Sequence, residues 1–149
     1  MITWTARAPV DDVALSALHA AAFGETPRLV GWGERLARHS LTWFTAVDDG
    51  RLVGFVNVAW DGDRHAFLLD TVVAPAHRGA GIGRELVARA VAAATDAGCT
   101  WLHADFAADL GPFYLDRCGL TPTSAGLLRL HRGEGAPASS RGQRRSSAG

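Results

Sequence analysis

The sequence predicts one domain of the α/β (α+β) class, in which helices pack on a mixed and mostly antiparallel sheet. Three strand-like segments follow one another through tight turns, and this arrangement favours an antiparallel meander. A strand, a glycine-containing loop, an amphipathic helix and a further strand come next, which is typical of a parallel β–α–β unit. We expect the domain to span residues 1–132, and residues 133–149, rich in Arg, Ser and Gly, to be a disordered tail.

The N-terminal part predicts one strand and two helices. Apolar and polar residues alternate over residues 2–6, as they do in a half-buried strand. Asp11 is a suitable N-cap for a first helix, which Gly24 can end. A second, shorter helix is expected to start at Pro27 and to include Leu36.

The meander is predicted from three apolar segments and two turn signals. The segments cover residues 42–47, 52–60 and 65–73. Asp-Asp-Gly at 48–50 and Asp-Gly-Asp at 61–63 are typical of tight hairpin turns. The three strands are therefore expected to be sequential neighbours in the sheet.

The C-terminal half continues with the β–α–β unit. Apolar residues at helical spacing over residues 86–94 mark one face of a helix that Gly98 ends. A strand is expected at 100–106, then a short helix around 112–115. A last strand is expected at 127–131 to complete the sheet.

The composition excludes several classes of function. The formal net charge is zero, Lys is absent and no basic stripe crosses the predicted domain, so the sequence does not fit a nucleic-acid-binding protein. No segment is apolar enough to span a membrane, and no leader-like stretch is visible. We therefore expect a soluble cytoplasmic protein with neither a nucleic-acid nor a membrane partner.

Cysteine and histidine do not indicate a disulfide framework or a metal site. Cys99 and Cys118 are the only cysteines and form no CxxC pair, so both are expected to be reduced. No metal is predicted. Several histidines lack metal-ligand spacing and are interpreted as surface or edge residues: His19, His39, His77, His103 and His131.

The loop at residues 78–83 reads Arg-Gly-Ala-Gly-Ile-Gly and stands directly before a helix. Glycines allow a tight turn and close backbone approach, and a helix N-terminus presents N–H donors, so the loop is suited to bind a pyrophosphate unless it only turns the chain. A Walker A loop is excluded because the chain has no Lys. A dinucleotide fingerprint is disfavoured because the position of its third glycine is Arg84.

Two motifs together resemble a known family. Residues 73–83, Val-Ala-Pro-Ala-His-Arg-Gly-Ala-Gly-Ile-Gly, look like the acyl-CoA loop of the GCN5-related N-acetyltransferase (GNAT) superfamily. Residues 113–120, Phe-Tyr-Leu-Asp-Arg-Cys-Gly-Leu, are similar to its FYxxxGF signature, with Leu120 in place of Phe. The resemblance covers about residues 1–131 and implies a GNAT-like sheet of about six or seven strands flanked by about four helices. It also implies a cleft where the strand at 65–73 splays from the strand at 100–106.

The resemblance implies how acetyl-CoA, the expected cosubstrate, would be held. The backbone of one strand would bond the pantetheine arm, and the amides of the loop would hold the pyrophosphate, with direct transfer of the acetyl group from the thioester to an amine. The residues implied are Val72, Val73, Arg78, Gly79, Ala80, Gly81, Ile82, Gly83 and Arg84. An Asn that many relatives carry before the Phe-Tyr pair is replaced here by Ala107.

Two residues are candidates for the proton transfers. Tyr114, the only tyrosine, matches the family's proton donor to the departing CoA thiolate, although it could instead be an amphipathic core residue. Asp70 is the candidate general base, with His65 and Asp105 as alternatives. Flanking apolar residues favour a raised pKa for Asp70, but it could instead only bind the substrate ammonium or hydrogen bond with a neighbouring backbone group.

The acceptor amine is expected near the first two helices and the cleft side of the meander. Aromatic and acidic residues there suit a primary amine, whether of a peptide, a polyamine, an amino sugar or an amino acid. The candidate residues are Phe23, Glu25, Trp32 and Trp60. A non-catalytic acyl-CoA-binding regulatory module is the alternative function, and a homodimer through a C-terminal edge strand is possible.

Overall fold

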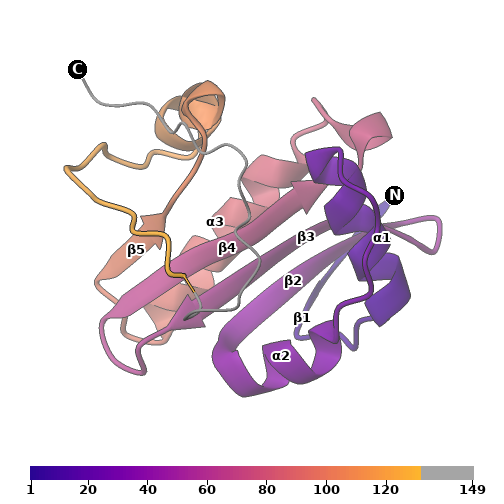
Figure 1. Cartoon of the computed structure of the whole chain (residues 1–149), viewed down its shortest axis with the longest axis horizontal. Helices are drawn as coiled ribbons and strands as arrows, with labels where there is room; N and C mark the ends of the chain where they lie inside the picture. Colours follow the sequence, from indigo (N-terminus) through magenta and orange to yellow (C-terminus); the bar gives the residue numbers. More distant parts are fainter. Residues whose placement is uncertain (132–149) are drawn as a thin grey trace.

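The computed structural model describes residues 1–131, which form one five-stranded sheet in the order β1-β2-β3-β4-β5 (Figure 1). Neighbouring strands from β1 to β4 are antiparallel, and β5 is parallel to β4, so the mixed and mostly antiparallel sheet is confirmed. The strands are β1 (Ile2–Ala6), β2 (Ser40–Asp48), β3 (Arg51–Trp60), β4 (His65–Val73) and β5 (Trp101–Ala104). The expected number of about six or seven strands was too high, because the described residues form five.

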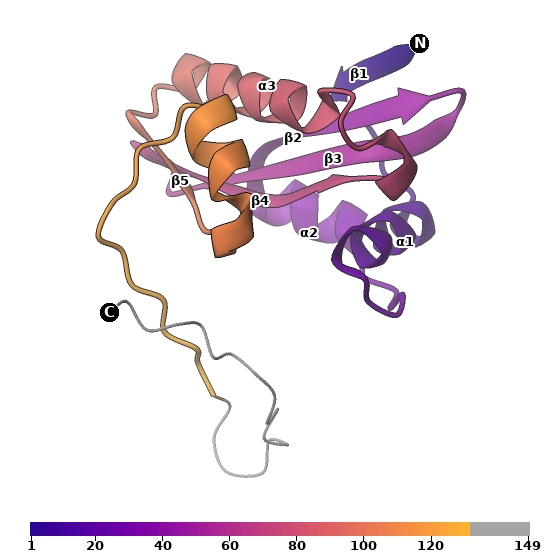
Figure 2. The same cartoon turned by 90° about the horizontal axis from the view of Figure 1, so that it is seen from above.

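The expected strand at 127–131 is the missing one. These residues have no regular secondary structure, and Leu127, Leu128 and Leu130 are at least 70% exposed. A short apolar run becomes a strand only where it finds a partner edge, and this segment runs away from the sheet (Figure 2). The boundary at residue 132 and the tail prediction for 133–149 lie outside the described residues.

Four helices accompany the sheet: α1 (Asp12–Phe23), α2 (Trp32–His39), α3 (Ile82–Asp96) and the short η3 (Pro112–Arg117). Single turns occur at η1 (Pro75–His77) and η2 (Ala108–Leu110). Within residues 1–131, no helix is long and apolar enough to cross a membrane.

The predicted limits of α1 are correct and the predicted start of α2 is wrong. The Asp11 carboxylate accepts a hydrogen bond of 2.8 Å from the Ala14 amide, and Gly24 ends α1 with φ 66°. α2 begins only after Gly31, because the buried Trp32 and Leu36 lie one turn apart and fix its start. The loop from Pro27 onward is instead part of the connection between α1 and α2.

The sheet is covered on both faces (Figure 2). α3 lies on one face, where Leu86, Val87 and Ala90 pack in the larger core. α1 and α2 lie on the other face, where Leu15 and Leu36 belong to the second core. The two cores bury the apolar sides of the three helices and hold them in fixed positions on the sheet.

β4 contains a bulge. Its pairing with β3 changes register between Phe55 and Asn57, so Asp70 and Thr71 lie opposite the single residue Val56. Asp70 has φ 55°, a left-handed conformation that non-glycine residues seldom adopt. The bulge therefore reorients the strand at the residue expected to be functional.

The bulge decides which face each side chain of β4 meets. Leu68 belongs to the α3-side core and Val72 to the α1/α2-side core, although strict alternation would put both on one face. Asp70 consequently turns toward α1 and α2, where it contacts both helices. Thr71 turns the other way and hydrogen bonds with Tyr114.

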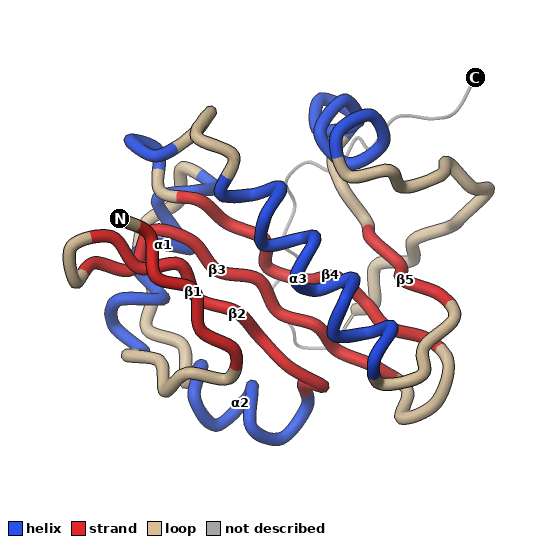
Figure 3. The backbone as a smooth tube through the Cα atoms, turned by 180° about the vertical axis from the view of Figure 1, so that it is seen from behind, coloured by secondary structure: helices blue, strands red, loops and turns tan. Residues whose placement is uncertain are grey.

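β4 and β5 pair only at their starts. The paired residues run from His65↔Trp101 to Leu68↔Ala104. After Ala104 the chain turns away toward η3 (Figure 3), so the outer edge of β4 from Leu69 to Val73 has no strand partner among the described residues. Its backbone groups are free to bond a ligand that lies along the strand.

Candidate active site

The loop before α3 has the backbone conformation of an anion site. Gly79 and Gly81 adopt φ values of 80° and 83°, which glycine reaches without a steric cost. The first intrahelical bond of α3 runs from the Glu85 amide to the Gly81 carbonyl at 3.1 Å, so the amides of residues 82–84 precede it and have no helical acceptor. The loop therefore presents several N–H donors at a helix N-terminus, which fits a pyrophosphate.

Gly83 joins this loop to the second motif. A Cβ placed on Gly83 would lie 3.1 Å from Phe113 Cζ and 3.3 Å from Phe113 Cε2. A side chain at this position would fit only if the Phe113 ring shifted by a few tenths of an ångström. The two motifs found in the sequence are therefore in direct contact.

The basic residues of the loop have separate contacts. The Arg78 guanidinium donates a hydrogen bond of 2.9 Å to the Ala22 carbonyl near the end of α1, so it anchors the loop to that helix. Arg84 is exposed at the start of α3. Burial raises the pKa of the Cys118 thiol, and the nearby positive charge of Arg84 opposes this rise.

Tyr114 lies at the junction of η3 and β4. It is only 8% exposed, stacks on Phe106 with centroids 4.6 Å apart and meets the edge of Phe113. Burial raises its pKa above the ordinary value of 10.0, and the hydrogen bond with Thr71 partly opposes the rise. The phenol is therefore protonated at neutral pH and can act as a donor.

The segment carrying Tyr114 departs from the family signature in one respect that the sequence analysis missed. Four residues separate Tyr114 from Gly119, where FYxxxGF has three. η3 absorbs the extra residue in a wide, π-type turn, with a hydrogen bond of 3.0 Å from the Cys118 amide to the Phe113 carbonyl. The wide turn keeps Tyr114 buried, while Leu115, four residues before Gly119, is only partly buried.

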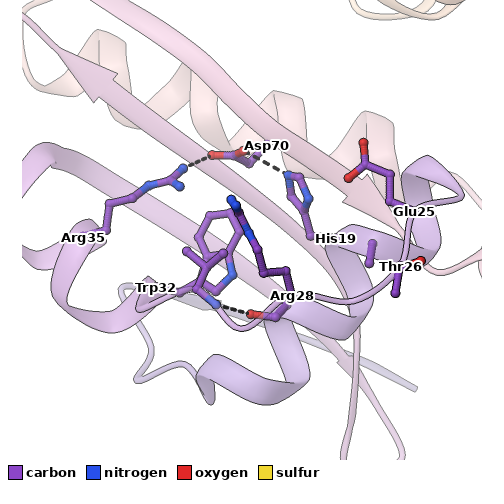
Figure 4. Close-up of a pocket in the computed structure, with 10 residues that line it drawn as sticks. His19, Glu25, Thr26, Arg28, Trp32, Arg35 and Asp70 are labelled. Atoms are coloured by element: carbon purple, nitrogen blue, oxygen red, sulfur yellow. Dashed lines mark hydrogen bonds and ion pairs between the residues drawn. The ribbon is translucent and has the colours of Figure 1, made fainter. Parts of the chain in front are cut away.

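Asp70 is held by a network on the α1/α2 face (Figure 4). One carboxylate oxygen lies 3.2 Å from His19 Nε2. The other accepts hydrogen bonds of 2.8 Å from the Arg35 guanidinium and 3.4 Å from the Asn57 side-chain amide. Ser40 Oγ in turn donates to Asn57 Oδ1 at 2.6 Å. The carboxylate is therefore fixed in orientation and only 17% exposed.

A pocket of about 170 Å³ opens beside Asp70, between α1, α2 and the loop that joins them (Figure 4). Two predicted acceptor residues, Glu25 and Trp32, line it. The indole N–H of Trp32 is buried and has no hydrogen-bond partner within residues 1–131. Phe23 does not line the pocket, but its ring packs on His19 at 4.8 Å.

Trp60 and the alternative bases lie away from this pocket. Trp60 is the last residue of β3, and alternation along the strand puts it on the face of Val58, which packs toward α3. His65 Nδ1 lies 2.8 Å from His103 Nε2 on neighbouring strands. Asp105 follows β5 and is exposed. None of these residues contacts Asp70.

His19 and Arg35 were missed as site residues. His19 was expected to be a surface or edge residue, but it is half-buried: its side chain is 27% exposed and lies between Asp70 and the rings of Phe23 and Trp32. A signal was present, since His19 follows Leu18 on the apolar face of the first helix. No local pattern linked Arg35 to Asp70.

Comparison with known proteins identifies the family. Residues 12–119 match the profile of the acetyltransferase (GNAT) family. The chain belongs to the GNAT acetyltransferase family. Its GNAT fold is also similar to a probable acetyltransferase from meticillin-resistant Staphylococcus aureus, with a TM-score of 0.75, 19% identity and coverage of 89% of this chain and 100% of that chain.

Two other similarities concern named acetyltransferases. Mycothiol acetyltransferase of Nocardia farcinica is 41% identical over 69 residues, which cover 46% of this chain and 22% of that protein. AAC(6')-Iy, in complex with the bisubstrate analog CoA-S-monomethyl-acetylneamine, has a TM-score of 0.68 at 19% identity and covers 89% of this chain and 99% of that chain. The GNAT chain described here spans about a fifth of the length of the curated relatives it matches.

Proposed function

We propose that this GNAT domain is an N-acetyltransferase that moves an acetyl group from acetyl-CoA to a primary amine of a small molecule or peptide, directly and in a ternary complex. The single observation that carries the proposal is the β4 bulge. It presents Asp70 to a pocket on one face and Thr71, with Tyr114, to the other. The amine that accepts the acetyl group and the acetyl-CoA that donates it would thus meet at β4 from opposite sides.

The free edge of β4 and the loop before α3 fit the acetyl-CoA that the family uses. The amides from Arg78 to Arg84 would hold the pyrophosphate, and the backbone at Val72 and Val73 would bond the pantetheine. Bound acetyl-CoA supplies the acetyl group as a thioester. The contact that an Asn makes in many relatives would be missing here, because Ala107 stands in its place.

Two proton transfers are assigned to residues of this chain. The Asp70–His19 pair accepts a proton from the substrate ammonium, so that the amine nitrogen can form the new N–C bond. As the C–S bond breaks, the Tyr114 hydroxyl gives its proton to the sulfur. Burial suits Tyr114 to this role because it keeps the phenol protonated until the thiolate develops.

The proposal is tested against a non-catalytic CoA-binding module by replacing Tyr114→Phe and Asp70→Asn. We expect each change to lower kcat by roughly 10²- to 10⁴-fold, as removal of a general acid or base does, with the Kd for acetyl-CoA nearly unchanged. Turnover is measured as thiol release against a panel of amines. His65→Gln is the matched control, because His65 lies outside the pocket, and it should keep wild-type kcat. Unaltered turnover in both site variants would remove the assigned roles.

We also propose a location and an oligomeric state for this chain. A cytoplasmic location agrees with the free thiols of Cys99 and Cys118. A homodimer could add a strand to the outer edge of β5, which pairs only with β4 among the described strands.

A further inference from the structure

We propose that the acceptor carries a carboxylate beside its amine, as an α-amino acid does. The inference rests on the proposed function, because it takes the pocket beside Asp70 as the acceptor site. The groups that line this pocket include two guanidiniums and two carboxylates, drawn from three segments of the chain. Charges of both signs in one small pocket match a zwitterionic head group.

Arg28 indicates that the ligand of this pocket carries an anionic group. It lines the pocket from the loop between α1 and α2, and no hydrogen bond or ion pair holds its guanidinium within residues 1–131. Figure 4 shows its side chain reaching toward the end of the pocket where Arg35 and Asp70 lie. An arginine without a protein partner presents a planar set of donors that fits a carboxylate with two hydrogen bonds.

Arg35 is a fixed second cation. One of its nitrogens donates to Asp70 Oδ2 at 2.8 Å, and its guanidinium stacks over the Trp32 ring at 4.4 Å. These contacts fix the guanidinium plane and leave it other N–H donors for a ligand. Arg28 and Arg35 together therefore provide a carboxylate site in the same pocket as Asp70.

The carboxylates of Glu25 and Asp70 would bind the ammonium group of the ligand. Glu25 is exposed at the pocket, and its contact with an ammonium would not compete with an existing ion pair among the described residues. The formal charges of the two guanidiniums and the two carboxylates are equal and opposite. A polyamine would meet two guanidiniums and a multiply anionic ligand would meet two carboxylates, so the charges favour a zwitterion over either.

The size of the pocket agrees with a compact head group. A volume of about 170 Å³ is close to the roughly 150 Å³ of an engineered protein cavity that binds benzene, so the pocket has room for a small group. This space suits the ammonium, the carboxylate and the carbon between them. Val30, Ala20 and the Trp32 ring add apolar surface at the pocket for the first part of a side chain.

The test uses matched sets of amines. Each L-amino acid is compared with its amino acid amide, which keeps the amine and lacks the negative charge, and with the decarboxylated amine. Thiol release is measured at saturating acetyl-CoA, and binding is measured by calorimetry in the presence of CoA. We expect the best acid to exceed its amide by at least about tenfold in kcat/KM, as the loss of a charge-assisted contact predicts.

Arg28→Gln supplies the decisive comparison, because an exposed loop residue can be changed without disturbing the core. It should raise KM for the acid at least about tenfold, with kcat and the KM for the amide nearly unchanged. Arg38→Gln is the matched control, since Arg38 lies on α2 outside the pocket and pairs with Glu34. Its acid-to-amide ratio should equal that of the wild type.

The outcomes separate this inference from the proposed function. Amides that react as well as acids, or an acid-to-amide ratio that Arg28→Gln leaves unchanged, would overturn the carboxylate site while acetyl transfer stands. The proposed function would instead be contradicted if the protein neither bound acetyl-CoA nor turned over any amine. In that case calorimetry still decides, because acids must bind at least about tenfold more tightly than their amides if the pocket recognises a carboxylate.

Discussion

At the scale of single residues, the properties of Tyr114 identify it as the candidate general acid. Tyr114 is the only tyrosine, and the chain contains no lysine, so few groups titrate near pH 10. Its buried position between Phe106 and Phe113 raises the pKa, and its hydroxyl meets the bulge at Thr71. Residue type, burial and contact all agree with a proton donor.

The titration of Tyr114 follows from this position. Phenolate absorbance should rise with a midpoint above pH 10 in the folded protein and near 10 in denaturant. Because the folded pKa is raised, the contribution of Tyr114 to stability is fully present below pH ~10 and is lost as pH rises through the folded pKa. The loss should be smaller in Tyr114→Phe, whereas a folded midpoint at or below 10 would show that the phenol is not buried.

At the scale of elements, local patterns predicted the strands well and the irregularities poorly. The bounds of β4, at 65–73, came from its apolar residues and the flanking turns. The bulge inside it leaves no pattern in the sequence, yet it alone turns Asp70 toward α1 and α2. Counting alternate residues from Leu68 would have put Asp70 in the α3-side core. The one-residue bulge therefore determines the face of the sheet on which the Asp70 side chain lies.

The wide turn of η3 leads to a second prediction, about the position at which a tyrosine can act. Counted back from Gly119, the position of the signature tyrosine is Leu115, whereas the turn presents Tyr114 to Thr71. The double variant Tyr114→Phe with Leu115→Tyr should therefore stay as inactive as Tyr114→Phe alone. Both are compared in thiol-release assays, with circular dichroism as the control for folding. Recovery of wild-type kcat by the shifted tyrosine would show that the spacing to Gly119 governs the site.

At the scale of the whole molecule, the order of elements could be read from the sequence because turns, caps and periodicity are local. Asp11, Gly24 and the 48–50 turn lie where they were expected. The network around Asp70 could not be read in this way. Its partners His19, Arg35 and Asn57 come from three different elements, and only folding brings them together. The pocket and its charges thus emerge from long-range packing.

The most direct test of the central claim is calorimetric titration of acetyl-CoA into the purified chain. The loop before α3 and the free edge of β4 predict saturable binding with a Kd in the micromolar range. Gly83→Ala should weaken it, because the added Cβ would displace Phe113 at the motif junction. Gly111→Ala, where a Cβ meets nothing within 4 Å, should bind like the wild type. If the wild-type chain shows no binding, the loop is only a turn and the proposed acetyl transfer is contradicted.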